Sequence, residues 1–274
     1  MEDINIVLDF LTWSFSKLNS YYKCPYAWKK RYIDCEDVEN DFFAEVGTSA
    51  HHTLEKYYKK EIDMFSAVED FENEWFENVV HDAPCNKYVD IKQSTYDKIH
   101  DYFENINIDL DKIEVLGVEE KVEFEIKGKK FVGYIDVLYR DKETNEIVIL
   151  DHKSSTIKLL KNGNISKTDM PHFTEFKRQE LLYSIPVIEK YGHVDKLQWN
   201  MFKTGNIITI PWNEEELKEA IKWAEDTLDI IANDVKHFPD TSNQFFCDHI
   251  CDMKHICEYR IRYDDSTGEW NKYQ

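Results

Sequence analysis

The stretch that most constrains the fold is FVGYIDVLYRDKETNEIVILDHKSS, residues 131–155. Its first nine residues alternate and are rich in β-branched and aromatic side chains, whereas DKETNE is polar and IVIL is a short apolar run. This pattern predicts two strands joined by a turn, with the second strand buried. The rest of the chain is expected to be organised around this hairpin.

Two carboxylates and a lysine stand out in the hairpin. Asp136 lies inside the first strand, where burying an acid without a partner is costly. Asp151 ends the second strand, and Lys153 follows two residues later, so their side chains point to the same face. Carboxylates suit a divalent cation, and a neighbouring lysine can orient or deprotonate a water molecule. The alternative is a turn with a surface ion pair.

A helix predicted over residues 45–60 carries the next candidate. It is opened by Gly47-Thr48, and His51 falls on its repeating face. His52 is adjacent, so at most one of the two histidines can face a given site. A single helical histidine can bind a metal or be an ordinary core or surface residue.

Two more segments offer polar residues to the same site. Residues 174–191 predict a helix in which Gln179 and Tyr183 are one turn apart on one face. Residues 113–127 predict a strand with an acidic run, in which Glu120 is a candidate for the metal shell. Without a neighbouring phosphate-processing site, these residues would be an ordinary helix surface and a solvated strand face.

Three of the six cysteines gather near the C-terminus: Cys247, Cys251 and Cys257. In a cytosolic chain, disulfides are not expected, so metal or iron–sulfur ligation is the leading interpretation. Zinc would need a fourth ligand from His249, His255 or Cys24. A cubane iron–sulfur cluster needs four thiolates, with Cys24 as the distant fourth. Three unligated thiols are the remaining alternative.

Composition narrows the class of protein. The 274 residues are 42% hydrophobic, which is enough for one large packed domain. No run of about 18 apolar residues occurs, and the acidic N-terminus lacks the features of a signal peptide, so a cytoplasmic location in a bacterial, archaeal or phage-infected cell is expected. The net charge of −20 argues against a protein that coats nucleic acid.

Taken in order, several motifs resemble the PD-(D/E)XK nuclease superfamily, specifically RecB-like, CRISPR-associated and AddB-type exonucleases with an iron–sulfur cluster, and related phage proteins. The motifs are SFSKLNSYYKCPYAWKKRYI, GTSAHHTLEKYY, GYIDVLY, LDHKSS, RQELLY and the cysteine triplet. The first gap in the triplet has three residues, whereas many relatives have two.

The resemblance implies an α/β fold with a restriction-endonuclease-like core, a central mixed sheet flanked by helices. It also implies a helical region and an iron–sulfur cluster that joins the N- and C-terminal segments. The whole chain, 1–274, would be a single nuclease domain. Its expected parts are the N-terminal segment 12–60, a helical insertion 61–112, the nuclease core 113–236 and the cysteine segment 237–274.

The resemblance also assigns roles to residues. The implied catalytic residues are Lys153, Asp136, Asp151, Gln179 and Tyr183. The implied ligands of Mg²⁺ or Mn²⁺ are His51, Asp136, Asp151 and the carbonyl of His152. The implied ligands of a [4Fe-4S] cluster are Cys24, Cys247, Cys251 and Cys257, with zinc as the alternative metal at that site.

The expected function is a metal-dependent DNA exonuclease that acts on single-stranded ends in recombination, repair or phage replication. Expected partners are DNA and proteins of a recombination, replication or CRISPR-type complex, with no membrane. The alternative is a non-catalytic subunit that uses the nuclease fold to bind DNA or protein. The full set of site residues favours the enzyme, whereas the negative charge favours the alternative.

Overall fold

The computed structural model describes residues 4–106, 108–264 and 269–272. The expected domain of 1–274 therefore has both of its ends outside the described part, as well as residues 107 and 265–268. Within that part, no helix is both long enough and apolar enough to cross a membrane.

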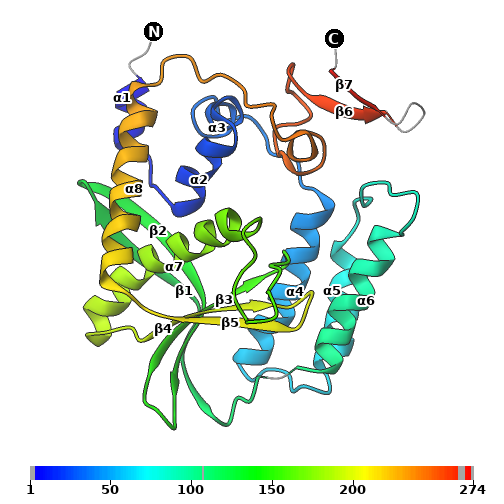
Figure 1. Cartoon of the computed structure of the whole chain (residues 1–274), viewed down its shortest axis with the longest axis vertical. Helices are drawn as coiled ribbons and strands as arrows, with labels where there is room; N and C mark the ends of the chain where they lie inside the picture. Colours follow the sequence, from blue (N-terminus) through cyan, green and yellow to red (C-terminus); the bar gives the residue numbers. More distant parts are fainter. Residues whose placement is uncertain (1–3, 107, 265–268, 273–274) are drawn as a thin grey trace.

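A five-stranded mixed sheet forms the centre of the structure, with the strands in sequence order (Figure 1). The strands are β1 (Ile113–Ile126), β2 (Lys129–Asp141), β3 (Ile147–Lys153), β4 (Lys196–Met201) and β5 (Asn206–Pro211). β3 and β4 are parallel and the other neighbours are antiparallel. The predicted hairpin is confirmed as β2–β3, and the predicted mixed sheet flanked by helices is present.

The helices lie on both sides of this sheet. They are α1 (Ile4–Phe10), α2 (Phe15–Lys23), α3 (Pro25–Tyr32), α4 (Phe42–Tyr58), α5 (Ala67–Asn78), α6 (Ile91–Glu104), α7 (Met170–Tyr191) and α8 (Glu214–Asn233). The tail adds a single π-helical turn, η1 (Phe246–Ile250), and a small hairpin of β6 (Ile261–Asp264) and β7 (Glu269–Lys272). The connection from β3 to β4 runs through α7, as a parallel pair requires.

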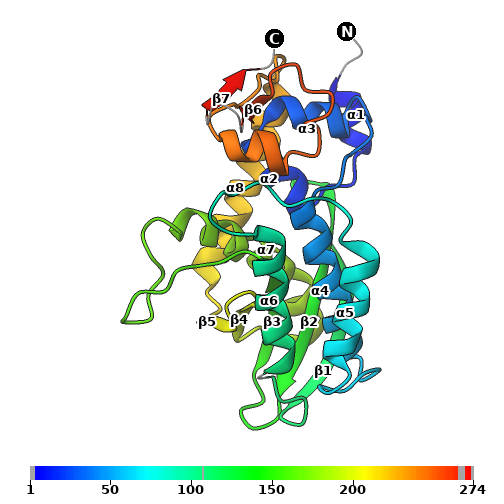
Figure 2. The ribbon, with the colours of Figure 1, turned by 90° about the vertical axis from the view of Figure 1, so that its right-hand side faces the viewer.

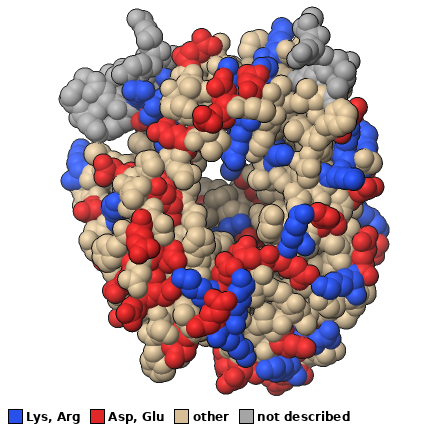
Figure 3. All heavy atoms as spheres, turned by 180° about the vertical axis from the view of Figure 1, so that it is seen from behind, with Lys and Arg blue, Asp and Glu red and all other residues tan. Residues whose placement is uncertain are grey.

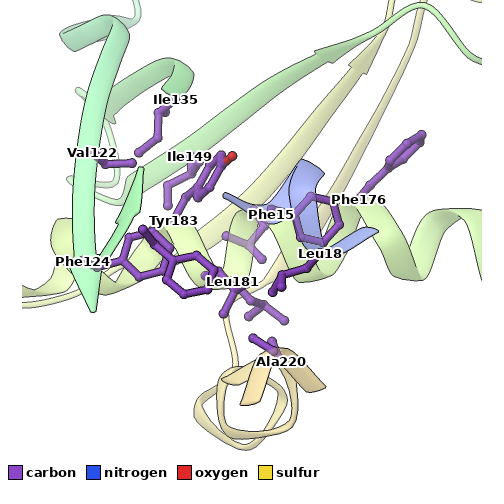
Figure 4. Close-up of a cluster of buried hydrophobic side chains, with 14 of the residues drawn as sticks. Phe15, Leu18, Val122, Phe124, Ile135, Ile149, Phe176, Leu181, Tyr183 and Ala220 are labelled. Atoms are coloured by element: carbon purple, nitrogen blue, oxygen red, sulfur yellow. The ribbon is translucent and has the colours of Figure 1, made fainter. Parts of the chain in front are cut away.

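Both faces of β3 are covered, which explains its continuous apolar sequence. Ile147 and Ile149 join a core with α2, α7 and α8, part of which is drawn in Figure 4. Val148 and Leu150 join a second core with α4, α5 and α6. Successive side chains of a strand point to opposite faces of the sheet. The burial of β3 on both faces therefore determines which face Asp151, His152 and Lys153 point to.

The start of α4 differs from the prediction. The helix begins at Phe42, not at Gly47, because Asp41 caps it. The Asp41 carboxylate accepts hydrogen bonds from the backbone N–H groups of Phe43 and Ala44, at 2.7 and 3.1 Å. Gly47 is therefore an interior helical residue, and the glycine signal was misleading because a cap six residues earlier, Asp41, already accepts hydrogen bonds from the first turn.

The two ends of the chain meet at one end of the molecule. Helices α1 to α3 lie at the same end of the molecule as η1, β6 and β7, above the sheet (Figures 1 and 2). Backbone and side-chain contacts join the two segments: the Glu39 N–H donates to the Asp252 carbonyl at 3.0 Å, and Arg31 forms an ion pair with the Asp252 carboxylate.

Gly133 on β2 allows α7 to pack closely, and this can be tested. A Cβ at position 133 would lie 2.3 Å from Cε1 of Tyr183, a buried ring. We therefore expect Gly133→Ala to lower the free energy of unfolding by about 1–3 kcal/mol, the usual cost of overpacking. Urea denaturation measures this change from the shift in midpoint.

The matched control is Gly47→Ala inside α4. The nearest neighbour of its new Cβ would be Ser154 Oγ at 3.8 Å, an ordinary contact. The free energy of unfolding should stay the same or rise by up to about 1 kcal/mol, because alanine favours the helix. Equal losses in the two variants would contradict the close packing at Gly133.

Candidate functional site

The end of β3 places an acid and a lysine against α7. The Nζ atom of Lys153 lies 2.9 and 2.8 Å from the two carboxylate oxygens of Asp151. The Gln179 side chain joins them: its Nε2 donates to Asp151 Oδ1 at 3.3 Å, and its Oε1 accepts from Lys153 at 3.4 Å. Asp151 is only 3% exposed, so this is a buried charged group and not the surface ion pair of the alternative interpretation.

Asp136 and His51 meet at the backbone of His152. Oδ2 of Asp136 accepts a hydrogen bond from the His152 N–H at 2.6 Å and lies 3.6 Å from His51 Nδ1. His51 Nε2 is 3.0 Å from the His152 carbonyl. A carbonyl only accepts, so Nε2 carries the hydrogen and the lone pair of Nδ1 faces Asp136. This is the arrangement in which a metal-binding histidine is oriented by its second nitrogen.

Glu119 is a neighbour that the sequence did not single out. Val118 pairs with Val137, and Glu120 pairs with Ile135, so Glu119 falls opposite Asp136 across the β1–β2 ladder. One ligand atom each from His51, Glu119 and Asp136 lie within 4.8 Å of one another. No other three His, Cys, Asp or Glu residues in the described ranges approach so closely. An imidazole and two carboxylates suit a divalent cation.

Glu120, the acid considered from the sequence, lies elsewhere. Its carboxylate accepts a hydrogen bond from Lys190 Nζ at 2.7 Å, on α7. Adjacent strand residues point to opposite faces, so only one of the two glutamates can face Asp136. The sequence shows the pair but not the register, which is why the wrong one was considered. Asp151 lies outside the 4.8 Å group and is held by Lys153 instead.

Glu180 is a second acid that the sequence reasoning missed. It is 1% exposed, and within the described residues its Oε2 has no hydrogen-bond partner. Burial, and then the charge of Asp151, raise its pKa well above the ordinary value, against the opposing effect of Lys153. Helical spacing could have predicted the burial of Glu180. It lies four residues after Phe176 and three before Tyr183, on the buried side of α7.

Tyr183, predicted with Gln179, packs into the core. Its ring lies against Gly133 and 6.4 Å, centroid to centroid, from Phe124. Figure 4 shows its hydroxyl pointing away from Leu181 in the same cluster. Burial, followed by the charge of Glu180, raises its pKa. Tyr183 therefore fixes α7 on β2, which sets the position of Gln179 one turn earlier.

The electrostatics of the site favour a bound cation. Burial and the charge of Asp151 raise the pKa of Asp136 to about 8, although Lys153 and the His152 N–H oppose the rise. Burial lowers the pKa of His51, so its imidazole is neutral. For Lys153 burial acts to lower the pKa, but the charges of Asp151 and Asp136 outweigh it and raise the pKa. Without a cation, Asp136 holds a proton at neutral pH, and cation binding would release it.

The predicted cysteine ligands converge at the end of the molecule where the termini meet. Cys24 joins α2 to α3, and its Sγ accepts a hydrogen bond from the Ala27 N–H at 3.5 Å. Cys24 and Cys251 are buried together with Met253. The remaining two predicted ligands, Cys247 in η1 and Cys257 in the following loop, are partly exposed.

The thiols are close enough to influence one another. Burial and the neighbouring thiols Cys24 and Cys257 raise the pKa of Cys247 to about 11. Burial, followed by weaker effects that include the same two thiols, raises the pKa of Cys251 to about 12. Cys85, by contrast, is exposed on the surface, as is Cys35. The structure thus separates four converging cysteines from two that lie apart.

An α/β core that gathers carboxylates, a histidine and a lysine at the end of its central strands defines a nuclease-type protein. The chain belongs to the PD-(D/E)XK nuclease superfamily, whose family model matches residues 12–258. That span includes every residue assigned a role above. No curated protein matches the chain significantly.

Two solved structures are similar to this one. A protein from Eubacterium rectale, described as a "Putative exonuclease", is 11% identical with a TM-score of 0.51, covering 89% of this chain and 87% of that one. At this identity the likeness concerns the fold alone. The protein SSO0001 is 18% identical with a TM-score of 0.30, covering 85% of this chain and 94% of that one.

The adjacent glutamates of β1 provide a matched test of the metal site. Glu119→Gln removes a carboxylate that faces His51 and Asp136, so we expect Mn²⁺ to bind at least about tenfold more weakly. Glu120→Gln removes a carboxylate that pairs with Lys190, so Mn²⁺ affinity should not change. Calorimetric titration of each variant with Mn²⁺ measures the difference. Equal affinities would remove Glu119 from the site.

Proposed function

We propose that this protein is a metal-dependent DNA exonuclease that hydrolyses phosphodiester bonds at single-stranded ends. The main support is the convergence of His51, Glu119 and Asp136 beside the Asp151–Lys153 pair, at the end of the central strands of a nuclease fold. The name of the Eubacterium rectale protein is consistent with an exonuclease.

The side chains present fit a divalent cation such as Mg²⁺ or Mn²⁺. His51 Nδ1 and the carboxylates of Asp136, Asp151 and Glu119 would hold it, and their hard oxygen atoms suit these ions. The predicted fourth ligand, the carbonyl of His152, accepts a hydrogen bond from His51 Nε2 here, and its second lone pair would be available to a cation. When bound, such an ion polarises a phosphate and lowers the pKa of a water molecule.

The protein groups around the ion have separate tasks. Lys153 remains an ammonium, so it is suited to stabilise charge on the phosphate oxygens and not to act as a base. Gln179 bridges Asp151 and Lys153 and keeps the two aligned. Before a cation binds, Lys153 is the ammonium that faces the site, and Asp151 already pairs with it at 2.8 Å, so little positive charge is left for a phosphate. Tight DNA binding should therefore require the cation.

A non-catalytic subunit that uses this fold to bind DNA or protein is the second candidate function. The observation that favours it is the net charge of −20, which disfavours contact with DNA outside a local groove. Proteins of recombination, repair, replication or CRISPR-type complexes are the partners that we propose for either function. The buried lysine and its bridging glutamine favour the enzyme, because binding alone does not require them.

We also propose a [4Fe-4S] cluster at the converging cysteines. Cys24, Cys247, Cys251 and Cys257 would supply the four thiolates that a cubane cluster needs, and zinc is the alternative metal at this site. The cluster would link Cys24 to the tail across most of the chain, which would stabilise the fold by closing a long loop.

Nuclease activity can be tested with Lys153→Ala. On a labelled single-stranded oligodeoxynucleotide with Mg²⁺ or Mn²⁺, we expect its cleavage rate to fall by about 10²–10³-fold, the usual cost of losing one group that stabilises transition-state charge. The control is Lys121→Ala, an exposed lysine on β1 that pairs only with Glu123. Gel analysis over time gives the rates and shows whether cutting begins at an end.

Three other results would change this proposal. Unchanged cleavage by Lys153→Ala would remove the assigned role. A wild-type protein that binds DNA but leaves it intact with either metal would support the non-catalytic subunit. Equal rates on duplex and single-stranded DNA would remove the strand preference.

The cluster can be tested with Cys24→Ser. Anaerobically purified wild-type protein should be brown and contain about four iron and four sulfide per chain. Cys24→Ser should lose the colour and most of the iron, whereas the exposed control Cys85→Ser should keep both. Colourless wild-type protein with one zinc per chain would identify zinc as the metal at this site.

A further inference from the structure

We propose that a cavity between α2, α3 and α7 holds the single strand on one side of the phosphate that is cut. The cavity has a volume of about 330 Å³, and one of its ends is formed by Lys153 and Gln179 of the candidate active site. This inference rests on the nuclease function proposed above and deepens it, by locating the path of the substrate and naming the groups that contact it.

The walls carry positive charge in a strongly acidic protein. Lys23, Arg31 and Lys153 line the cavity, and Glu175 is the one carboxylate among its lining residues. Asn19 Nδ2 also donates to that carboxylate, at 2.8 Å. Each of the three cations pairs with an acid, Lys23 with Glu175 at 3.5 Å, Arg31 with Asp252 and Lys153 with Asp151, so a phosphate would share them with these carboxylates. Seen from behind, the molecule is hollowed near its centre, and both basic and acidic side chains lie around the hollow (Figure 3). Such a groove attracts a phosphate backbone although the net charge is negative.

Aromatic rings stand beside these cations. His172 and Phe176 on α7 lie 4.5 Å apart, centroid to centroid, and the Nζ of Lys153 is 5.0 Å from the Phe176 centroid. On the opposite wall, the Tyr32 ring has the Arg31 guanidinium 5.1 Å from its centroid. Phe176 is buried, whereas His172 and Tyr32 are partly exposed and are the rings on which a base can stack. Rings beside cations bind single strands without reading sequence, because every base has a face that can stack.

The size of the cavity selects the class of substrate. At about 330 Å³ it is near the lower end of the range of roughly 300–1,000 Å³ for pockets that hold one small organic molecule. A cavity of this size can hold a segment of a single strand beside Lys153 and Gln179. Ser16, Asn19 and Ser20 add polar groups on the α2 wall, within reach of phosphate or sugar oxygens.

The test compares Lys23→Gln with Lys222→Gln, both in an Asp151→Asn background that keeps the strand uncut. The two lysines are exposed to 43% and 66% and each pairs with an acid, but Lys222 lies on α8 away from the cavity. Fluorescence anisotropy with a labelled oligothymidylate and Mn²⁺ gives the binding constant at several salt concentrations. Lys23→Gln should reduce the slope of log K against log salt by about 0.7, the contribution of one phosphate contact. Lys222→Gln should leave the slope unchanged.

A second variant guards against a misfolded Lys23→Gln protein. His172→Ala removes a ring from the α7 wall, and we expect about fivefold or greater loss of oligothymidylate binding with an unchanged salt slope. Thermal melting of each variant checks that the fold is intact. Folded Lys23→Gln with the parent slope, or folded His172→Ala with the parent affinity, would overturn the cavity as the path of the strand.

The enzymatic proposal is judged separately in the same experiment. If wild-type protein cuts the oligothymidylate but the cavity variants bind like the parent, only the assignment of the cavity fails. If wild-type protein binds but never cuts, the nuclease proposal fails while a change in slope would still place the strand in the cavity.

Discussion

The arrangement on which the rest of the structure depends is an excess of buried carboxylates around one lysine. Asp136, Asp151 and Glu180 are enclosed where β2, β3 and α7 meet, and Lys153 is the ammonium that faces them. Burying several acids beside one cation is unfavourable, and the raised pKa of Asp136, about 8, reflects that cost. A divalent cation would reduce this unfavourable interaction between the acids. The buried carboxylates that destabilise the metal-free protein would therefore also give the site its affinity for a metal.

The fold holds these groups in place through packing from both faces of the sheet. On one face α4 brings His51 to the His152 backbone, and on the other α7 brings Gln179 to Asp151. The close contact between Gly133 and Tyr183 sets how near α7 can lie. A cluster bound at Cys24, as proposed, would fix the wall of the proposed strand path, because Cys24 is the residue at which α2 stops. Structural metal and catalytic metal would thus serve the same substrate.

Local rules account for what the sequence predicted well. The β2–β3 hairpin followed from its alternating and apolar runs, and the shared face of Asp151 and Lys153 followed from the period of two in a strand. The errors came where distance in sequence mattered. The choice between Glu119 and Glu120 depends on strand register, and the burial of Glu180 depends on where α7 packs.

The sequence by itself determined the β2–β3 hairpin, the family motifs and the candidate acids, histidine, lysine and cysteines, because each depends on short spacings and residue chemistry. Only the tertiary structure decided which acids share a site, which cysteines converge and that a basic cavity begins at Lys153. The physical reason is that these contacts join segments that are distant along the chain, and their side chains meet only after the two faces of the sheet are packed.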